Sequence, residues 1–258
     1  MKEISFVELP LYIPERFEQL ENDKQRTHAA VYREYNDEKY AQLANAASFE
    51  EAVKLYRGPV RDTVFSRHNK FYRAPSNEAH ALREALVISS LYPLLDGVDT
   101  IIELGAGFGQ TLEVIRRAYP SLRYIAGEPS PEARALGERV APDISFVPFD
   151  FYDETWHIFD GVQNALVFSS YAVSLLPDAQ MVADKLKAYA PQIRAVSLFE
   201  PIYEDGDSPI FEARKRYIEA NDYCRTILQS FDAEVERDFF GTNPLFPEAN
   251  LVLKKGLG

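Results

Sequence analysis

From residue 99 onward, the chain alternates between short apolar stretches with strand character and segments with the spacing of amphipathic helices. The strand-like stretches are TIIEL, RYIAGE, ISFVPFD, NALVFSS and RAVSLFEP, and the helical segments include TLEVIRRAY, SPEARALGERV and DAQMVADKLKAYA. A longer helix is expected from about Pro209 to Leu228, followed by two closing strands in FDAEV and ANLVLKK. This alternation predicts an α/β fold for residues 99–258: a doubly wound sheet of about seven strands, mostly parallel, with helices on both faces.

The first 98 residues have a different pattern, which is mostly helical. Helix-forming residues dominate from Glu15 to about Ala47, and a capping box with Ser48 and Glu51 begins a second helix that ends at Gly58. A third helix is expected between Pro75 and Pro93. We expect residues 1–98 to form a helical extension that serves as a cap or lid over the site, or as the interface of a homodimer.

The composition of the chain indicates which kinds of molecule it should not bind and where in the cell it is expected. The 258 residues carry a formal net charge of −12, which argues against a nucleic-acid binder because phosphate neutralisation needs a basic surface. The longest nearly apolar run, Ala85 to Leu95, is too short to span a membrane, and the N-terminal residues lack the pattern of a signal peptide. With a single cysteine, Cys224, the chain suits a reducing compartment, and we expect a cytoplasmic protein.

Three glycines, Gly105, Gly107 and Gly109, stand between the first predicted strand and the helix that follows it. Such a turn lets the backbone approach a ligand closely and points helix N–H groups at it. The dinucleotide fingerprint G-x-G-x-x-G is not met because position 110 is Gln, and no Gly-Lys-Ser/Thr follows that would indicate a phosphate-binding P-loop.

The stretch ELGAGFG resembles motif I of the class I S-adenosylmethionine-dependent methyltransferases, a family with a Rossmann-like fold. The stretches GEPSPEA, FVPFDFYD and ALVFSSYAVSLLPD are similar to the motifs at the family's second, third and fourth strands, in the same order. The resemblance implies S-adenosylmethionine as cofactor. It also implies that an acid grips the ribose hydroxyls, that another lies near the adenine amino group, and that an aromatic ring covers the adenine. The cofactor-binding residues it implies are Glu103, Gly105, Ala106, Gly107, Gly109, Glu128 (ribose), Pro129, Asp150 (adenine amino group), Phe151 (adenine face) and Ser169.

A basic segment between Arg57 and Arg73 interrupts the otherwise acidic sequence. We expect it either to form a lid that binds an anionic group of the substrate, with Arg67, Lys70, Tyr72 and Arg73 as contacts, or to be a solvated loop with salt bridges. Two histidines in or just beyond it, His68 and His80, are candidate general bases, because an imidazole of near-neutral pKa suits a hydroxyl acceptor. Tyr171, after the fourth strand, is a third catalytic candidate.

Further substrate-binding candidates follow the fifth strand and lie on the long helix. Glu200 and Tyr203 come after the strand, and Asn221 and Tyr223 belong to the helix, where Tyr217, Asn221 and Cys224 would share one face. We expect no metal site, because no carboxylate set with a known ligand spacing is present.

The acceptor is the least determined part of the function. The Asn/Asp-Pro-Pro-Tyr type of motif found in many nitrogen methyltransferases is replaced by SSYA, so we expect methylation of oxygen. The acceptor would be a hydroxyl or a carboxylate on a small molecule or peptide, as in natural-product biosynthesis. A sugar or amine acceptor, and a scaffold or binding protein without catalysis, are the alternatives.

Overall fold

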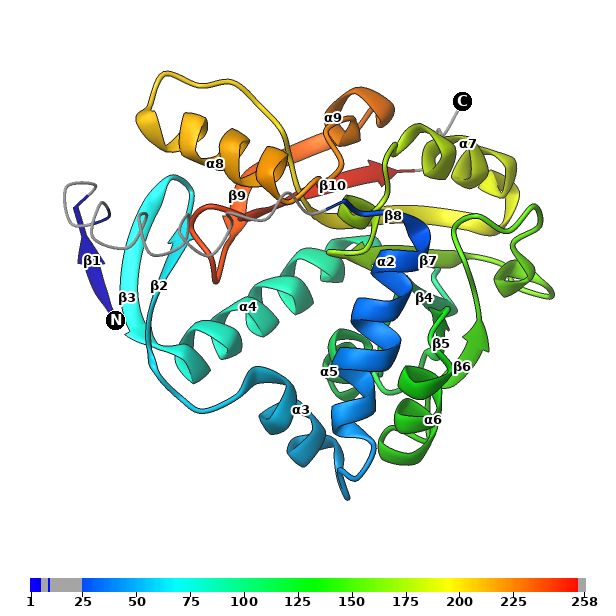
Figure 1. The fold of residues 1–258 in the computed structure, drawn as a ribbon. Helices are drawn as coiled ribbons and strands as arrows, with labels where there is room; N and C mark the ends of the chain where they lie inside the picture. The colour runs from blue at the N-terminus through cyan, green and yellow to red at the C-terminus, as the bar shows by residue number, and fades with distance from the viewer. Residues whose placement is uncertain (6–8, 10–24, 255–258) are drawn as a thin grey trace.

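A seven-stranded sheet is the centre of the computed structural model, which describes residues 1–5, 9 and 25–254 (Figure 1). Its strands lie in the order β6-β5-β4-β7-β8-β10-β9. In chain order they are β4 (Thr100–Leu104), β5 (Arg123–Glu128), β6 (Ser145–Pro148), β7 (Ala165–Ser170), β8 (Ile193–Pro201), β9 (Glu234–Phe240) and β10 (Glu248–Lys254). Only β10 runs antiparallel to both of its neighbours, so the predicted mostly parallel sheet is confirmed.

The strand order reverses direction between β4 and β7. From β4 the chain builds outward through β5 and β6, then returns to the other side of β4 and continues through β7 and β8. At such a reversal, the loops after the two strands diverge and leave a crevice at the carboxyl ends of the strands. Glu103 near the end of β4 and Ser170 at the end of β7 therefore flank the expected binding site.

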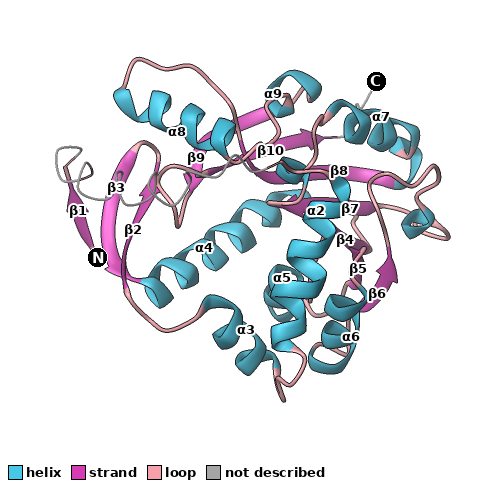
Figure 2. Ribbon diagram, viewed as in Figure 1, coloured by secondary structure: helices cyan, strands magenta, loops and turns pink. Residues whose placement is uncertain are grey.

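Helices cover both faces of the sheet, so the residues of its central strands are almost all buried (Figure 2). Neighbouring residues such as Ile101 and Ile102 enter different hydrophobic cores on opposite faces, as the two-residue period of a strand requires. One core includes residues from α4 (Ser76–Leu91), α5 (Gln110–Ala118) and α6 (Pro131–Val140). The other includes residues from α7 (Gln180–Ala188) and α9 (Ile227–Ser230). Short 3-10 turns are η4 (Tyr92–Leu94), η5 (His157–Phe159), η6 (Val173–Leu175) and η7 (Ala190–Gln192).

The N-terminal extension contains the expected helices. They are α2 (His28–Arg33), the π-helix η2 (Glu34–Tyr40), the 3-10 turn η3 (Ala41–Leu43) and α3 (Phe49–Arg57). The capping prediction for α3 is confirmed, since the Ser48 side chain accepts from the Glu51 N–H and the helix is followed by Gly58. The beginning of the expected helix, residues 15–24, lies outside the described residues.

The extension also contains a small antiparallel sheet that the sequence did not predict. Strands β2 (Asp62–Arg67) and β3 (Lys70–Pro75) form a hairpin, and β1 (Lys2–Ile4) pairs with β3. The turn consists of His68 and Asn69, which have φ angles of 50° and 58°. Two consecutive residues in the left-handed region are what a two-residue hairpin turn needs, and His and Asn tolerate that region better than most residues. The basic segment is therefore a hairpin, and the alternative of a solvated loop there is wrong.

The long helix expected to reach Leu228 ends earlier. Helix α8 (Pro209–Ala220) is closed by Asp222 in the left-handed region, with a φ of 53°. The N–H groups of Asp222 and Tyr223 donate to the carbonyls of Glu219 and Ile218, which is the pattern of a Schellman cap. Asn221 and Cys224 therefore do not share a helical face with Tyr217, and that part of the prediction is wrong.

Among residues 1–5, 9 and 25–254, no helix combines the length and the apolar character that a membrane span requires.

One glycine in α6 illustrates how tightly the helices pack on the sheet. A Cβ atom on Gly137 would lie 2.2 Å from Phe146 of β6. Gly137→Ala gains about 1 kcal/mol of helix propensity but forces the ring to move, at a cost of about 1–3 kcal/mol for overpacking. We expect a net loss of unfolding free energy, measured by urea denaturation.

The matched background for this test is Phe146→Leu, which shortens the side chain that the new methyl group meets. In that background, Gly137→Ala should be less destabilising or should stabilise the protein. An equal loss in both backgrounds would show that contact with Phe146 is not the cause.

Candidate active site

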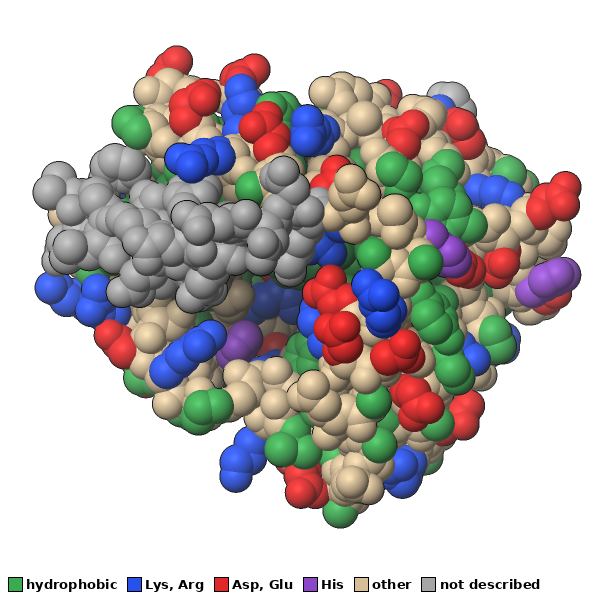
Figure 3. All heavy atoms as spheres, viewed as in Figure 1, with side chains coloured by type: hydrophobic (Ala, Val, Ile, Leu, Met, Phe, Trp, Pro, Cys, Tyr) green, Lys and Arg blue, Asp and Glu red, His purple; other side chains and the backbone are tan. Residues whose placement is uncertain are grey.

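A cavity of about 350 Å³ lies at the carboxyl ends of the central strands, between the sheet and the N-terminal helices. Figure 3 shows the face of the molecule on which α2 lies, with a hollow whose walls carry both basic and acidic side chains. The sheet side of the wall includes Glu103, Gly105, Ala106, Gly107, Phe108, Glu128, Pro129, Ser130, Asp150, Phe151, Tyr152, Ser170, Tyr171 and Ala172. The helical side includes His28, Val31, Tyr32, Tyr35, Tyr40, Tyr56, His80, Arg83, Gln110 and Thr111.

The three glycines of the turn after β4 all have φ angles in the left-handed region: 75° at Gly105, 56° at Gly107 and 78° at Gly109. This explains their alternate spacing, since residues with a Cβ are strained there. A Cβ on Gly107 would also lie 2.4 Å from the Tyr40 hydroxyl oxygen. The turn thus presents bare backbone to the cavity at Gly105 and Gly107.

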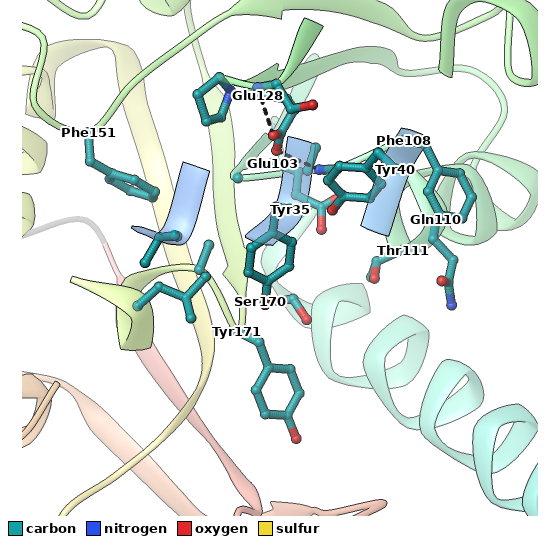
Figure 4. Close-up of a pocket in the computed structure, with 18 of the residues that line it drawn as sticks. Tyr35, Tyr40, Glu103, Phe108, Gln110, Thr111, Glu128, Phe151, Ser170 and Tyr171 are labelled. Atoms are coloured by element: carbon teal, nitrogen blue, oxygen red, sulfur yellow. Dashed lines mark hydrogen bonds between the residues drawn. The ribbon is translucent and has the colours of Figure 1, made fainter. Parts of the chain in front are cut away.

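Glu103 is the acid at the floor of the cavity (Figure 4). The residue is 3% exposed, and no described residue forms a hydrogen bond with its Oε2 atom. Burial raises the pKa of this carboxyl well above its usual range. A buried acid with an unpaired oxygen can take a cationic or hydrogen-bond-donating ligand, because such a ligand would satisfy that oxygen and favour the ionised form.

Glu128, at the end of β5, is held by the backbone. Its Oε2 accepts from the Gly107 N–H at 2.8 Å and its Oε1 accepts from the Ser130 N–H at 3.0 Å. Burial raises the pKa of Glu128 to about 7, even though these two hydrogen bonds act in the opposite direction. Each carboxylate oxygen has a second lone pair, so Glu128 can still accept from a ligand in the cavity.

Asp150 and Phe151 follow β6 and form the far wall of the cavity. Asp150 accepts from the Tyr152 N–H at 3.0 Å and lies 2.7 Å from Nε2 of His28 in α2. The Phe151 ring is fixed by edge contacts with Phe149 and Trp156. Glu103, Glu128 and Asp150 therefore meet around one cavity although they lie 25 and 22 positions apart in sequence.

Two predicted residues support the site without lining it. Glu200 in β8 is completely buried and accepts from Ser169 Oγ and from the N–H groups of Ala172, Val173 and Ser174, the last three at 3.0 Å each. It therefore fixes the loop that carries Tyr171, whose φ of 55° is unusual for a tyrosine. Ser169 and Glu200 are not among the residues on the cavity wall, which corrects their expected roles as direct contacts.

The two candidate general bases, His80 and His68, lie in different parts of the structure. His80 lines the cavity, and its pKa is lowered to about 4 by burial and by Arg57, Arg83 and Arg61. His68 is at the tip of the hairpin, exposed, with Nε2 2.8 Å from Glu236, and does not line the cavity. Tyr171 does line the cavity, and burial raises the pKa of its hydroxyl well above 10.

The expected substrate contacts lie elsewhere on the molecule. Lys70 and Arg73 pair with Glu3 and Asp62 on exposed surface, and Tyr72 stacks on Phe65. Tyr203 donates to Glu219, the Asn221 carbonyl accepts from Arg26, and Tyr223 stacks on Phe246. None of these seven residues is on the cavity wall: Arg67, Lys70, Tyr72, Arg73, Tyr203, Asn221 and Tyr223. The hairpin is instead bound to β9 through Ser66 and His68.

Sequence reasoning missed the tyrosines that close the cavity. Tyr35 and Tyr40 come from the π-helix η2, and their ring centroids are 6.0 Å apart. Five positions correspond to about 140° on an α-helix, so these residues do not read as one face there. In a π-helix, the i→i+5 hydrogen bonds bring them together. Tyr56 of α3 was missed as well, and it contacts Phe108.

In the part of the chain that the structure describes, no group of three or more His, Cys, Asp or Glu side chains is placed to hold a metal ion.

Comparisons with known proteins identify the fold. No protein-family model and no curated protein sequence matches this chain. Among solved structures, human N-acetylserotonin methyltransferase in complex with S-adenosylmethionine is similar, with a TM-score of 0.51 and 12% identity over 95% of this chain. The pyocyanin biosynthetic protein PhzM (TM-score 0.48, 19% identity) and LepI with S-adenosylhomocysteine and a substrate analogue (0.46, 16%) match 67% and 62% of this chain. The alignments span 66%, 55% and 43% of those three chains, in each case less than two thirds.

The role of Glu200 can be tested by Glu200→Gln. The amide nitrogen would face at least one of the N–H groups that the carboxylate now accepts from, so we expect a loss of about 1–3 kcal/mol in unfolding free energy. Glu219→Gln, on exposed surface, is the control and should change it by less than about 0.5 kcal/mol. Equal stability of the Glu200→Gln protein and the native protein, measured by urea denaturation, would contradict the anchoring role.

Proposed function

We propose that this chain, whose fold is that of the class I S-adenosylmethionine-dependent methyltransferases, binds S-adenosylmethionine and transfers its methyl group to an oxygen of a small-molecule or peptide acceptor. One observation carries the proposal. Three acids at or just beyond the ends of β4, β5 and β6 meet around a single cavity whose floor is a glycine turn of bare backbone. The acids are Glu103, Glu128 and Asp150.

The donors and acceptors on the wall fit this cofactor. Glu128 would accept from the ribose hydroxyls, and Asp150 would accept from the adenine amino group beside the Phe151 ring. The unpaired Oε2 of Glu103 suits the cationic methionine amino group, and the bare backbone at Gly105 and Gly107 allows close approach. When bound, S-adenosylmethionine supplies a methyl group activated by a sulfonium.

The chain's own contribution to the reaction is to position the acceptor, exclude water and, for a hydroxyl acceptor, remove a proton. The α2 and η2 residues on the wall support a role for the N-terminal extension as a cap over the site. His80 is the base candidate that lines the cavity. Its lowered pKa keeps the imidazole neutral at pH 7 but makes it a weak base. The sequence SSYA at the end of β7 supports oxygen rather than amide nitrogen as the acceptor atom.

The direct test has two stages. Calorimetry should show S-adenosylmethionine and S-adenosylhomocysteine binding at a single site, and Glu128→Ala should weaken both. Mass spectrometry should then detect the mass gain of one methyl group in a panel of hydroxyl and carboxylate acceptors. Absence of binding by both compounds would overturn the proposal.

The raised pKa of Glu128 gives this binding a pH dependence. Below pH 7 the carboxyl of the free protein is mostly protonated, whereas ribose hydroxyls favour the ionised, accepting form. Binding should therefore release one proton below pH 7, and it should neither release nor take up a proton above pH 7. We expect the affinity for S-adenosylhomocysteine to rise by up to about tenfold from pH 6 to pH 8, measured by calorimetry.

Glu128→Gln is the control, because its amide does not titrate. In that variant, affinity should be lower and nearly constant between pH 6 and pH 8. If both proteins show the same slope, another group is responsible and the assignment of Glu128 to the ribose is wrong.

A further inference from the structure

One side of the cavity carries hydrogen-bond donors, whereas another side carries the three acids. Figure 4 shows Gln110 and Thr111, from the first turn of α5, across the cavity from Phe151. His80 and Arg83 reach the cavity from α4, and because they are three positions apart they lie on the same face of that helix. Arginine has only hydrogen-bond donors, and the Thr111 hydroxyl and the Gln110 amide can donate as well.

Arg83 is held in one orientation. Its Nε and Nη2 atoms donate to the two oxygens of Glu248 at 2.8 and 2.7 Å, and Nη2 also donates to Ser170 Oγ at 2.7 Å. Glu248 is completely buried in β10, and the Arg83 side chain is only 13% exposed. A paired, planar guanidinium held in this way loses little further freedom when it binds a ligand.

One donor group of Arg83, Nη1, has no partner in the part of the chain that the structure describes, although Arg83 lines the cavity. A ligand in the cavity that presents acceptor oxygens could accept hydrogen bonds from Nη1. The charged groups that act on the neighbouring His80 are Arg57, Arg83 and Arg61, all basic, and together with burial they lower its pKa. Arg83 and Arg57 are themselves paired with Glu248 and Glu84, so the unpartnered Nη1 donor, rather than a net positive charge, favours a ligand with acceptor oxygens.

We propose that Arg83 binds a carboxylate group of the methyl acceptor through Nη1, assisted by Thr111 and Gln110, so that the substrate is a carboxylic acid. This inference rests on the proposed function and names the substrate class of the same site. It replaces the exposed arginines of the hairpin as the anion contact. A carboxylate at this position would lie near His80 and would favour protonation of the imidazole.

The experiment compares benzoate and hippurate with their neutral amides, benzamide and hippuramide, on protein saturated with S-adenosylhomocysteine. The readout is the titration of the His80 ring by NMR, with its resonance identified by its loss in His80→Asn. We expect both acids to raise the His80 pKa by at least one unit, a tenfold increase in proton affinity. The amides should leave it unchanged.

Two variants separate the role of Arg83 from general electrostatics. Arg83→Gln would leave Glu248 buried without its partner, so Arg83→Gln/Glu248→Gln is made as well, to keep an uncharged, hydrogen-bonded pair. Both should abolish the response to the acids, whereas Arg73→Gln, on the exposed hairpin, should keep it.

The proposal is overturned if acids and amides act alike, if neither acid shifts His80, or if the response survives in the double variant. Calorimetry of S-adenosylhomocysteine on the native protein keeps the two proposals distinct. If that ligand binds and the acids have no effect, only the carboxylate inference fails. If the ligand does not bind, the proposed function fails.

Discussion

Buried carboxylates that accept from backbone N–H groups hold this site together. Glu128 joins the turn after β4 to the turn after β5, through Gly107 and Ser130, and Glu200 holds the loop after β7 through three consecutive N–H groups. Both acids are deeply buried, and the free energy of desolvating them is offset by hydrogen bonds that fix the turns in place. The crevice created by the strand order thereby becomes a defined cavity before any ligand arrives.

The two sides of that cavity are formed by different kinds of structural element. The acids and the glycine turn belong to the sheet, whose strands are buried on both faces and whose register leaves little freedom. The tyrosines come from α2, η2 and α3, where few residues are buried. Donor groups from α4 and α5 complete the wall, so the cavity has carboxyl groups at one end and hydrogen-bond donors at the other.

The sheet was predictable from sequence because its signals are local. The period of each strand, and each of the motifs that contain Glu103, Glu128 and Asp150, lies within a short stretch, and these acids do meet. The hairpin was not predicted, because its turn uses His68 and Asn69 where glycine is usual, and the end of α8 depends on a left-handed aspartate. The pairing of Arg83 with Glu248 joins residues 165 positions apart, and no pattern in the sequence indicates it.

The π-helix η2 over the cavity and the short helix α2 before it contain almost no buried residues. Helix α2 has six residues and none of them is buried, and in η2 only Tyr40 is buried. Segments this short form helices in water only when they pack against something, and a π-helix is less regular still. Asn36 contacts Ser130, His28 contacts Asp150 and Tyr40 packs over Gly107. The conformation of this segment therefore depends on its contacts with the strand ends beneath it more than on the helix propensity of its own residues.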